Sequence, residues 1–177
     1  MDKTLYDGIN YCLACGARLL VTTDREGKLR PGCQACGWVY YKNPVPAVAV
    51  VVLNEANQIL LIKRRFAPQA GEWALPSGYM EVTLSPEENA LEELLEETGL
   101  IGEISHCIGW HYGSSPLYHR ILNLGFRVCV TGGTLQAGDD AEEALFVELD
   151  ALPPIAFASH RKFINLETGT KLPLDYH

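Results

Sequence analysis

The 177 residues include 22 acidic and 14 basic side chains, which gives a formal net charge of −8. Apolar residues make up 47% of the chain and charged residues 20%, the mix of a soluble globular protein of one domain, with or without a small appendage. The longest apolar run, Val45 to Leu53, is far too short to span a membrane, and residues 1–4 contain no signal-peptide hydrophobic region. We therefore expect a cytoplasmic protein with no membrane partner.

The negative charge is pooled in one third of the chain. Between Phe66 and His119 there is no Lys or Arg, while the same stretch holds nine Glu. This stretch carries −9 and the rest of the chain sums to +1. Carboxylates gathered in this way repel one another unless a cation lies among them. Basic patches of the nucleic-acid-binding kind are absent, so we expect no nucleic-acid partner.

Two CxxC pairs open the chain, each followed by glycine: Cys12 and Cys15, then Cys33 and Cys36. Four sulfurs suit tetrahedral Zn²⁺, and a site closed by four thiolates has no open position, so the metal would be structural. The pattern predicts a zinc ribbon over residues 1–44, with redox-active pairs or plain buried thiols as the alternative. Cys107 and Cys129 lie in apolar surroundings and are predicted to be core thiols.

The second predicted domain, residues 45–177, alternates strands and helices. The continuous β-branched run at 45–53 is typical of a strand buried on both faces, and residues 58–63 return after a turn. Residues 66–79 are rich in Pro and Gly and predict a loop. Further strands are predicted at 121–130 and 144–149, followed by a helix at 156–166. Such an order indicates a mixed sheet covered on both faces.

One helix has clear start and stop signals. Ser85 suits the N-cap, Pro86 the first helical position, and Glu88 completes a capping box. Gly99 ends the helix. Five side chains of the helix, most of them apolar, are predicted to share one face: Ala90, Leu91, Leu94, Leu95 and Thr98.

On the same helix Glu93, Glu96 and Glu97 stand at positions i, i+3 and i+4. Their side chains are predicted to share a face away from the leucines. That face is either simply solvated or binds a divalent cation, because Mg²⁺ and Mn²⁺ favour carboxylate oxygens.

The segment from Gly78 to Leu100 resembles the Nudix box, in which Gly, five residues, Glu and seven residues precede Arg-Glu-apolar-x-Glu-Glu-x-Gly-apolar. The preceding Trp73-Ala-Leu-Pro-Ser is similar to the lead-in loop of that family. With its flanking strands the resemblance covers about residues 45–165, and the N-terminal ribbon is similar to that of zinc-ribbon Nudix proteins, including NADH pyrophosphatases. The resemblance implies an α+β fold, a Nudix α/β/α sandwich with a mixed sheet, preceded here by a small zinc ribbon.

The box departs from the family pattern at two positions. Leu84 stands where the family has Glu, and Glu92 stands where it has Arg. In the family that Arg orients the adjacent catalytic carboxylate through an ion pair. Glu92 would add repulsion instead, and the loss of such support costs on the order of 10–100-fold in metal affinity or activity.

The resemblance implies hydrolysis of the pyrophosphate of a nucleoside diphosphate linked to another moiety. Mg²⁺ or Mn²⁺ would be held by Glu93, Glu96 and Glu97, the implied catalytic residues. The general base would be one of these or a carboxylate of the acidic loop at 138–143, with Glu143 as the candidate. The alternative for that loop is an ordinary solvated turn. Family analogy alone implies a homodimer.

Candidate substrate contacts lie at the start of the box and on both sides of it: Arg64, Arg65, Trp73, Gly78 and Arg120. For the two adjacent arginines the alternative is an exposed strand end, and for the tryptophan a place in the core. The substrate signals are mixed, because Pro116 and Tyr118 each match a different Nudix subclass. They favour ADP-ribose or a similar nucleotide sugar, with an NADH-like substrate as a further candidate. The alternative function is a catalytically weak nucleotide-binding or regulatory protein with a degenerate box.

Overall fold

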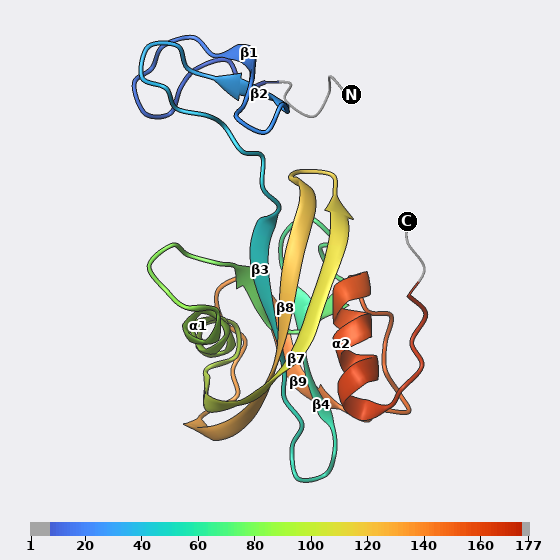
Figure 1. Ribbon diagram of the computed structural model, residues 1–177. Helices are drawn as coiled ribbons and strands as arrows, with labels where there is room; N and C mark the ends of the chain where they lie inside the picture. Colours follow the sequence, from blue (N-terminus) through green and yellow to red (C-terminus); the bar gives the residue numbers. More distant parts are fainter. Residues whose placement is uncertain (1–7, 175–177) are drawn as a thin grey trace. The chain divides into compact units, whose positions relative to one another are not determined.

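The computed structural model describes residues 8–174, so the outermost parts of both predicted domains, residues 1–7 and 175–177, lie outside the description. The chain divides into two compact units between Asn43 and Pro44 (Figure 1). Within residues 8–174 no helix combines the length and the apolar character needed to cross a membrane.

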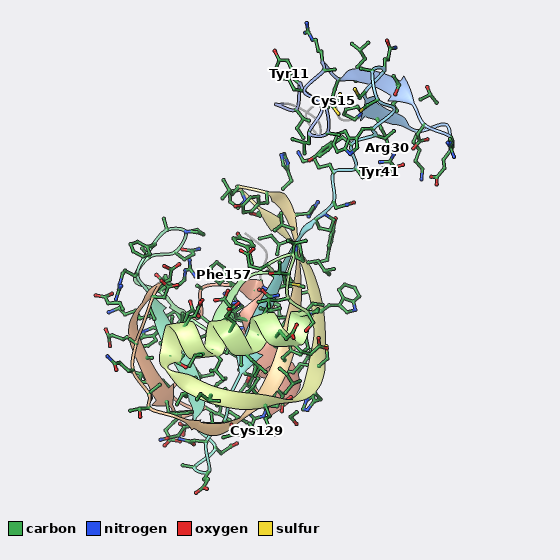
Figure 2. All side chains as sticks on the ribbon, turned by 90° about the vertical axis from the view of Figure 1, so that its left-hand side faces the viewer. Tyr11, Cys15, Arg30, Tyr41, Cys129 and Phe157 are labelled. Atoms are coloured by element: carbon green, nitrogen blue, oxygen red, sulfur yellow. The ribbon has the colours of Figure 1, made fainter. Side chains whose placement is uncertain are left out.

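The first unit is built around a short antiparallel hairpin. Its strands are β1 (Leu20–Thr23) and β2 (Leu29–Gly32). Asp24 closes the turn by accepting hydrogen bonds from the backbone N–H groups of Glu26 and Lys28 and from the side chain of Arg30. The guanidinium of Arg30 also lies 4.6 Å from the ring centre of Tyr41 (Figure 2). The buried apolar core of this unit is small, so a further stabilising element such as a metal is expected.

The second unit contains two sheets and two helices. A four-stranded mixed sheet has the order β6-β3-β8-β7, in which β3 and β8 are parallel and the other pairs antiparallel. A three-stranded antiparallel sheet has the order β5-β4-β9. The elements run in chain order as β3 (Val45–Val51), β4 (Ile59–Arg64), β5 (Trp73–Ala74), β6 (Ser77–Tyr79), α1 (Pro86–Thr98), β7 (Leu100–Ser115), β8 (His119–Gly133), β9 (Ala141–Val147) and α2 (Ala158–Thr168).

The two helices cover opposite faces of the mixed sheet, as β3 shows. Successive side chains of a strand point to opposite faces. Val48 and Val50 therefore pack in one cluster with Leu94 of α1, and Ala49 packs in the other with Phe163 of α2. The predicted α/β/α sandwich with a mixed sheet is confirmed, as is the prediction of a strand buried on both faces.

The longest strand was not predicted from the sequence. Strand β7 pairs with β8 along its length, but its register shifts at three places, between Ile101 and Gly102, Ile104 and His106, and Cys107 and Gly109. Each shift interrupts the alternation of polar and apolar residues by which a strand is recognised. The predicted loop at 66–79 also contains β5 and β6, which are too short to give a periodic signal.

The limits of helix α1 are confirmed, but its predicted faces are partly wrong. The Ser85 side chain and Glu88 form the capping box, and Gly99 adopts a left-handed conformation with φ of 68°. Leu95, however, is exposed, whereas Glu97 is buried with 3% of its surface accessible. The carboxylate side of the helix packs against β6 and an adjoining loop, so burial does not follow the apolar stripe.

The prediction that Cys107 and Cys129 are core thiols is wrong, because both are exposed. Cys107 lies on β7, which is an edge strand. Arg127, which precedes Cys129 by two residues and so shares its face of β8, pairs with Glu167 in the last turn of α2. Cys129 therefore lies beyond the end of the covering helix.

Candidate active site

The carboxylates of α1 lie against strand β6. The backbone N–H of Ser77 donates a hydrogen bond of 2.8 Å to Oε2 of Glu97. A Cβ added to Gly78 would lie 1.8 Å from Oε1 of Glu93, so only glycine leaves room for this side chain. Because β6 is paired with the buried strand β3, the two carboxylates are positioned by the rigid part of the fold.

Burial and mutual repulsion make these acids weak. Burial, together with the charge of Glu93, raises the pKa of Glu97 to about 8, although the Ser77 N–H and the nearby charge of Arg64 act in the opposite direction. Burial also raises the pKa of Glu93 to about 7, and the neighbouring charge of Glu96 adds to the effect. The pKa of the exposed Glu96 is raised as well, by partial burial and by the charge of Glu92. Such a group of acids favours a bound proton or a bound cation at neutral pH.

The acidic loop at 138–143 approaches the last turn of α1. The N–H of Gly138 donates to the carbonyl of Glu97 across 3.1 Å. A Cβ on Gly138 would lie 2.5 Å from the carbonyl oxygen of Glu96, so this close approach requires glycine. The charges of Asp139 and Asp140 are near enough to contribute to the raised pKa of Glu93.

Glu143, the predicted candidate for the general base, is engaged elsewhere. It lies on β9 opposite Lys63 of β4, and its Oε1 accepts an ion-paired hydrogen bond of 2.8 Å from Nζ of Lys63. Glu142 lies 3.9 Å from the same ammonium group. Within the predicted candidate loop, the charges of Asp139 and Asp140 act on Glu93, and we therefore favour these two over Glu143.

The structure separates the five predicted substrate contacts. Gly78 lies at the carboxylates, and Arg64 is near enough for its charge to act on Glu97. Arg65 bonds to backbone carbonyls of the acidic loop. Trp73 is half-buried and packs with the core on the α2 face. Arg120 is exposed near the β7–β8 turn, with its guanidinium 5.6 Å from the ring centre of Tyr112.

Three polar residues near the site were not predicted from the sequence. The backbone N–H of Ser77 donates to Glu97. Every residue except proline has this group, so the residue type does not reveal the contact. Asn89 is buried in α1, where its side chain accepts from the N–H of Glu81 and donates to the carbonyl of Ser85. A polar residue on the apolar side of a predicted helix is a signal that could have identified it.

His160 is the third of these residues. Its Nδ1 accepts a hydrogen bond of 3.1 Å from the N–H of Leu75. Burial lowers the pKa of His160 to about 3, and the nearby charge of Arg64 contributes. The imidazole is therefore neutral, and it fixes the segment that leads into β6.

The four cysteines of the first unit form a site of the zinc-ribbon kind. Their sulfurs all lie within 4.8 Å of one another, and two of the separations are 3.6 Å (Cys12 to Cys36) and 3.5 Å (Cys15 to Cys33). A tetrahedron of Zn–S bonds of about 2.3 Å has edges of about 3.8 Å, so the geometry fits Zn²⁺. Figure 2 labels Cys15, one of the four.

The α1 carboxylates form a looser group. Across residues 8–174, the four cysteines are the one set of three or more donor side chains gathered this closely. The donors of α1 nevertheless suit a hard divalent cation, because all are carboxylates.

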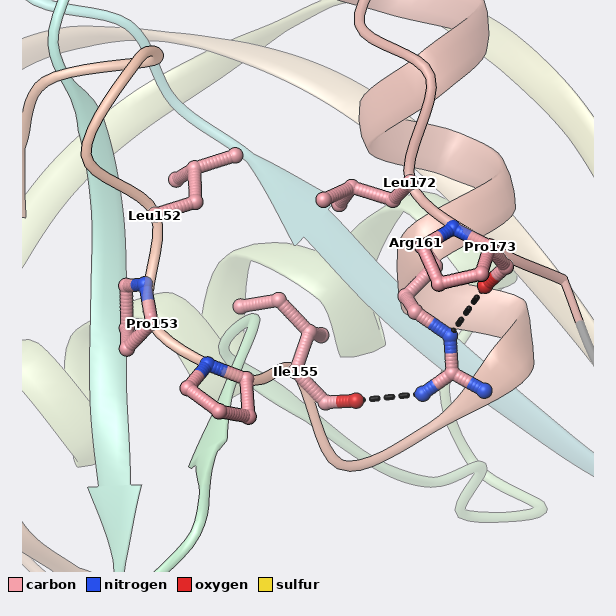
Figure 3. A pocket seen from close by; sticks show the side chains of 7 residues that line it. Leu152, Pro153, Ile155, Arg161, Leu172 and Pro173 are labelled. Atoms are coloured by element: carbon pink, nitrogen blue, oxygen red, sulfur yellow. Dashed lines mark hydrogen bonds between the residues drawn. The ribbon is translucent and has the colours of Figure 1, made fainter.

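Two hollows of the second unit lie apart from these carboxylates. One of about 350 Å³ is lined by Leu152, Ile155, Arg161, Leu172 and neighbouring prolines (Figure 3). Another of about 330 Å³ lies between Val52, Glu55 and Cys129. Neither is lined by Glu93, Glu96 or Glu97, and the candidate active site is formed by α1, β6 and the acidic loop.

Comparisons with known proteins agree with this architecture. The NUDIX domain family matches residues 43–166. The chain is 43% identical over 122 residues to an ADP-ribose pyrophosphatase of Methanocaldococcus jannaschii, covering 67% of this chain and 71% of that protein. It is 30% identical over 164 residues to the NAD-capped RNA hydrolase NudC of Chromobacterium violaceum, covering 90% of this chain and 58% of that protein.

A solved structure extends the likeness over most of the chain. The crystal structure of a NUDIX hydrolase from Nitrosomonas europaea has a TM-score of 0.75 and 27% identity, with 89% of this chain and 90% of that chain covered. The chain therefore belongs to the NUDIX family of hydrolases. Outside the matched residues 43–166 the chain carries the four-cysteine ribbon, and inside them its box has Leu84 and Glu92.

Proposed function

We propose that this protein is a divalent-metal-dependent enzyme that cleaves the pyrophosphate of a nucleoside diphosphate linked to another moiety. The observation that carries the proposal is the placement of Glu93 and Glu97 against Gly78 and Ser77, with the pKa of both carboxyls raised toward neutrality. Acids held in this way have a strong electrostatic reason to take up a cation.

We favour ADP-ribose or a similar nucleotide sugar as the substrate. The relative in M. jannaschii is named an ADP-ribose pyrophosphatase, and its similarity covers two thirds of this chain. An NADH-like substrate is the second candidate, since this chain is also similar to NAD-capped RNA hydrolases. The chain spans about half to three fifths of the length of those hydrolases, so their activity is a weaker guide.

The residues of the site have distinct tasks in this proposal. Mg²⁺ or Mn²⁺, when bound by Glu93, Glu96 and Glu97, would neutralise pyrophosphate charge and lower the pKa of an attacking water. The N–H of Ser77 holds the Glu97 carboxylate in place. Arg64 contributes positive charge beside it and would contact a phosphate oxygen.

The proton of the attacking water needs a carboxylate as its acceptor. Asp139 and Asp140 are better placed for this than Glu143, because their loop is bonded to the last turn of α1 while Glu143 is paired with Lys63. Replacing each of the three carboxylates by its amide would identify the base from the loss of kcat and of its basic pH dependence.

Hydrolysis is tested with ADP-ribose, NADH, a nucleotide sugar and a dinucleoside polyphosphate. Products are separated by chromatography in the presence of Mg²⁺, of Mn²⁺ and of neither. We expect AMP from ADP-ribose with either cation, and no product from the Glu96→Gln or Glu97→Gln variant. The matched control is Glu103→Gln, which removes an exposed carboxylate from β7. If no compound is cleaved at high enzyme concentration, the proposal is overturned.

The alternative is a nucleotide-binding protein with little turnover. Glu92 favours it, because this residue is exposed on α1 and its charge raises the pKa of both Glu93 and Glu96. Restoring the family pattern with Glu92→Arg and Leu84→Glu is expected to raise the rate by about 10–100-fold. A rate equal to that of the unaltered protein would mean that other residues of this chain already support the catalytic carboxylates.

The remaining expectations concern the whole chain. We propose that the ribbon binds one Zn²⁺ per chain with a structural role, and that residues 1–44 and 45–177 are separate domains. A homodimer and a cytoplasmic location stay predictions, which sedimentation and cell fractionation would test.

A further inference from the structure

Arg65 makes an unusual set of contacts for an exposed arginine. Its backbone N–H donates to the carbonyl of Asp140 across 2.8 Å. Its Nη1 donates to the carbonyl of Asp139 across 2.8 Å, and its Nη2 to the carbonyl of Ala141 across 2.9 Å. Three successive carbonyls of the acidic loop are thus bound by one residue. The two side-chain bonds use the planar fork of the guanidinium, which the point-like ammonium of lysine does not reproduce.

The position of Arg65 follows from an irregularity in the sheet. Lys63 is opposite Glu143, but Arg64 is opposite Ala141, so the register of β4 and β9 shifts between the two. A bulge of this kind bends its strand and changes the direction of the side chains that follow. Here it brings Arg65 to the loop at the place where β9 begins.

The opposite side of the loop is bonded to helix α1. Gly138 N–H donates to the carbonyl of Glu97 across 3.1 Å, and Gln136 N–H to the carbonyl of Thr98 across 2.9 Å. Directly after these anchors Asp139 adopts a left-handed conformation with φ of 44°, which few residues other than glycine adopt, although aspartate does so more readily than most. Such a conformation persists when surrounding hydrogen bonds hold the backbone in place. On the β4 side of the loop, Arg65 makes these bonds.

The box position that the family gives to arginine is Glu92 in this chain, so α1 supplies no guanidinium to its own carboxylates. We infer that Arg65 is the positioning residue that compensates for this loss, because it holds from the β4 side the acidic loop whose other side is bonded to α1. The inference rests on the proposed function. It does not require Arg65 to touch the substrate, which was its predicted role.

The test compares Arg65→Gln and Arg65→Lys with the unaltered full-length protein. We expect kcat for ADP-ribose to fall by about 10–100-fold in both variants and the affinity for Mn²⁺, measured by electron paramagnetic resonance, to fall in parallel. The KM for ADP-ribose should change little. A residue that binds the substrate phosphate would instead raise KM, so a change in KM with kcat retained would overturn the inference.

Arg161 provides a matched control. Its guanidinium also bonds to two backbone carbonyls, those of Pro173 and Ile155, in the hollow of Figure 3 away from the carboxylates. Arg161→Gln should lower the melting temperature but leave kcat and Mn²⁺ affinity unchanged. If it lowers kcat as much as Arg65→Gln does, both effects are general losses of stability and the inference is wrong.

A rescue experiment separates compensation from simple loop support. Glu92→Arg is introduced alone and together with Arg65→Gln. If Arg65 replaces the missing arginine of the box, Glu92→Arg raises kcat and Mn²⁺ affinity by a larger factor in the Arg65→Gln protein than in the unaltered protein. If the two factors are equal, Arg65 does not compensate for Glu92. Parallel Mn²⁺ results with no hydrolysis by the unaltered protein would retain this inference and reject the proposed function.

Discussion

The backbone N–H of Ser77 donates a 2.8 Å hydrogen bond to Oε2 of Glu97, which joins the residue before the box to the helix inside it. Glu97 is one of the few buried charged side chains among the described residues, with 3% of its surface exposed. A buried carboxylate is costly unless it is bonded, protonated or bound to a cation. The buried Glu97 carboxylate therefore lowers the stability of the cation-free protein.

Replacing Glu97 by Gln is expected to reduce hydrolysis strongly while preserving the fold. The amide oxygen can still accept the Ser77 N–H, and the buried charge is removed. Activity should fall by at least the roughly 10–100-fold that loss of a supporting partner costs at a metal site. The melting temperature at pH 8 without divalent cations should stay equal or rise. A clear fall in melting temperature would show that the charge itself stabilises the fold.

Gly78→Ala tests the space beside Glu93. The added Cβ would lie 1.8 Å from Oε1 of Glu93, so the carboxylate must move. We expect a large loss of kcat and of Mn²⁺ affinity with a moderate loss of stability. Gly132→Ala is the matched control, since no atom lies within 4 Å of the position of its Cβ. Equal activity of the two variants would mean that Glu93 does not need its present position.

The stability of the protein without bound divalent cations should fall as pH rises from about 7 to 9. The pKa of Glu93 rises to about 7 and that of Glu97 to about 8 from an ordinary value of 4.5. Between pH 4.5 and about 8 the native state therefore holds more protons than the unfolded state. Stability decreases with pH wherever the native state binds more protons. Mg²⁺ replaces those protons, so its stabilising effect should be greater at pH 8 than at pH 6.

Thermal melts across this range check the prediction, in Mg²⁺-free buffer without a chelator so that zinc is retained. The range begins at pH 7 because His160 acts in the opposite direction below it. The lowered pKa of His160, about 3, makes the unfolded state the better proton acceptor as pH falls below 6.5. Glu93→Gln combined with Glu97→Gln should flatten the slope above pH 7. If the slope of stability against pH is unchanged in this double variant, other ionisable groups cause it.

Zinc content should be near one per chain and should be lost in Cys33→Ser. The sulfurs at 3.5 and 3.6 Å form a set suited to one tetrahedral ion, and the unit around them has little apolar core. Cys107→Ser, which alters an exposed thiol outside the set, should retain the metal. Atomic absorption measures the zinc content of both variants. Full zinc content in Cys33→Ser would exclude the four-thiolate site.

Local sequence signals predicted several elements correctly, because the forces that form them act between near neighbours. The limits of α1 follow from Ser85, Glu88 and Gly99, all within one turn of the helix ends. Strand β3 follows from its unbroken β-branched composition. Strand β7 was missed because its bulges depend on pairing with β8, which the local pattern does not contain.

The carboxylates were recognised from spacing, but their chemistry was not. The i, i+3, i+4 pattern places Glu93, Glu96 and Glu97 on one side of a helix whatever the rest of the fold. Their degrees of burial differ because β6 and the acidic loop cover Glu97 and Glu93 but leave Glu96 exposed.

The sequence by itself determined the pooled charge, the four-cysteine pattern and the box with its departures at Leu84 and Glu92. Only the tertiary structure decided how this chain arranges the surroundings of that box. Ser77 bonds to Glu97, Lys63 pairs with Glu143, and Arg65 holds the loop of Asp139 and Asp140. These contacts join residues from 20 to 80 positions apart, and their partners are selected by strand pairing and helix packing rather than by local preference.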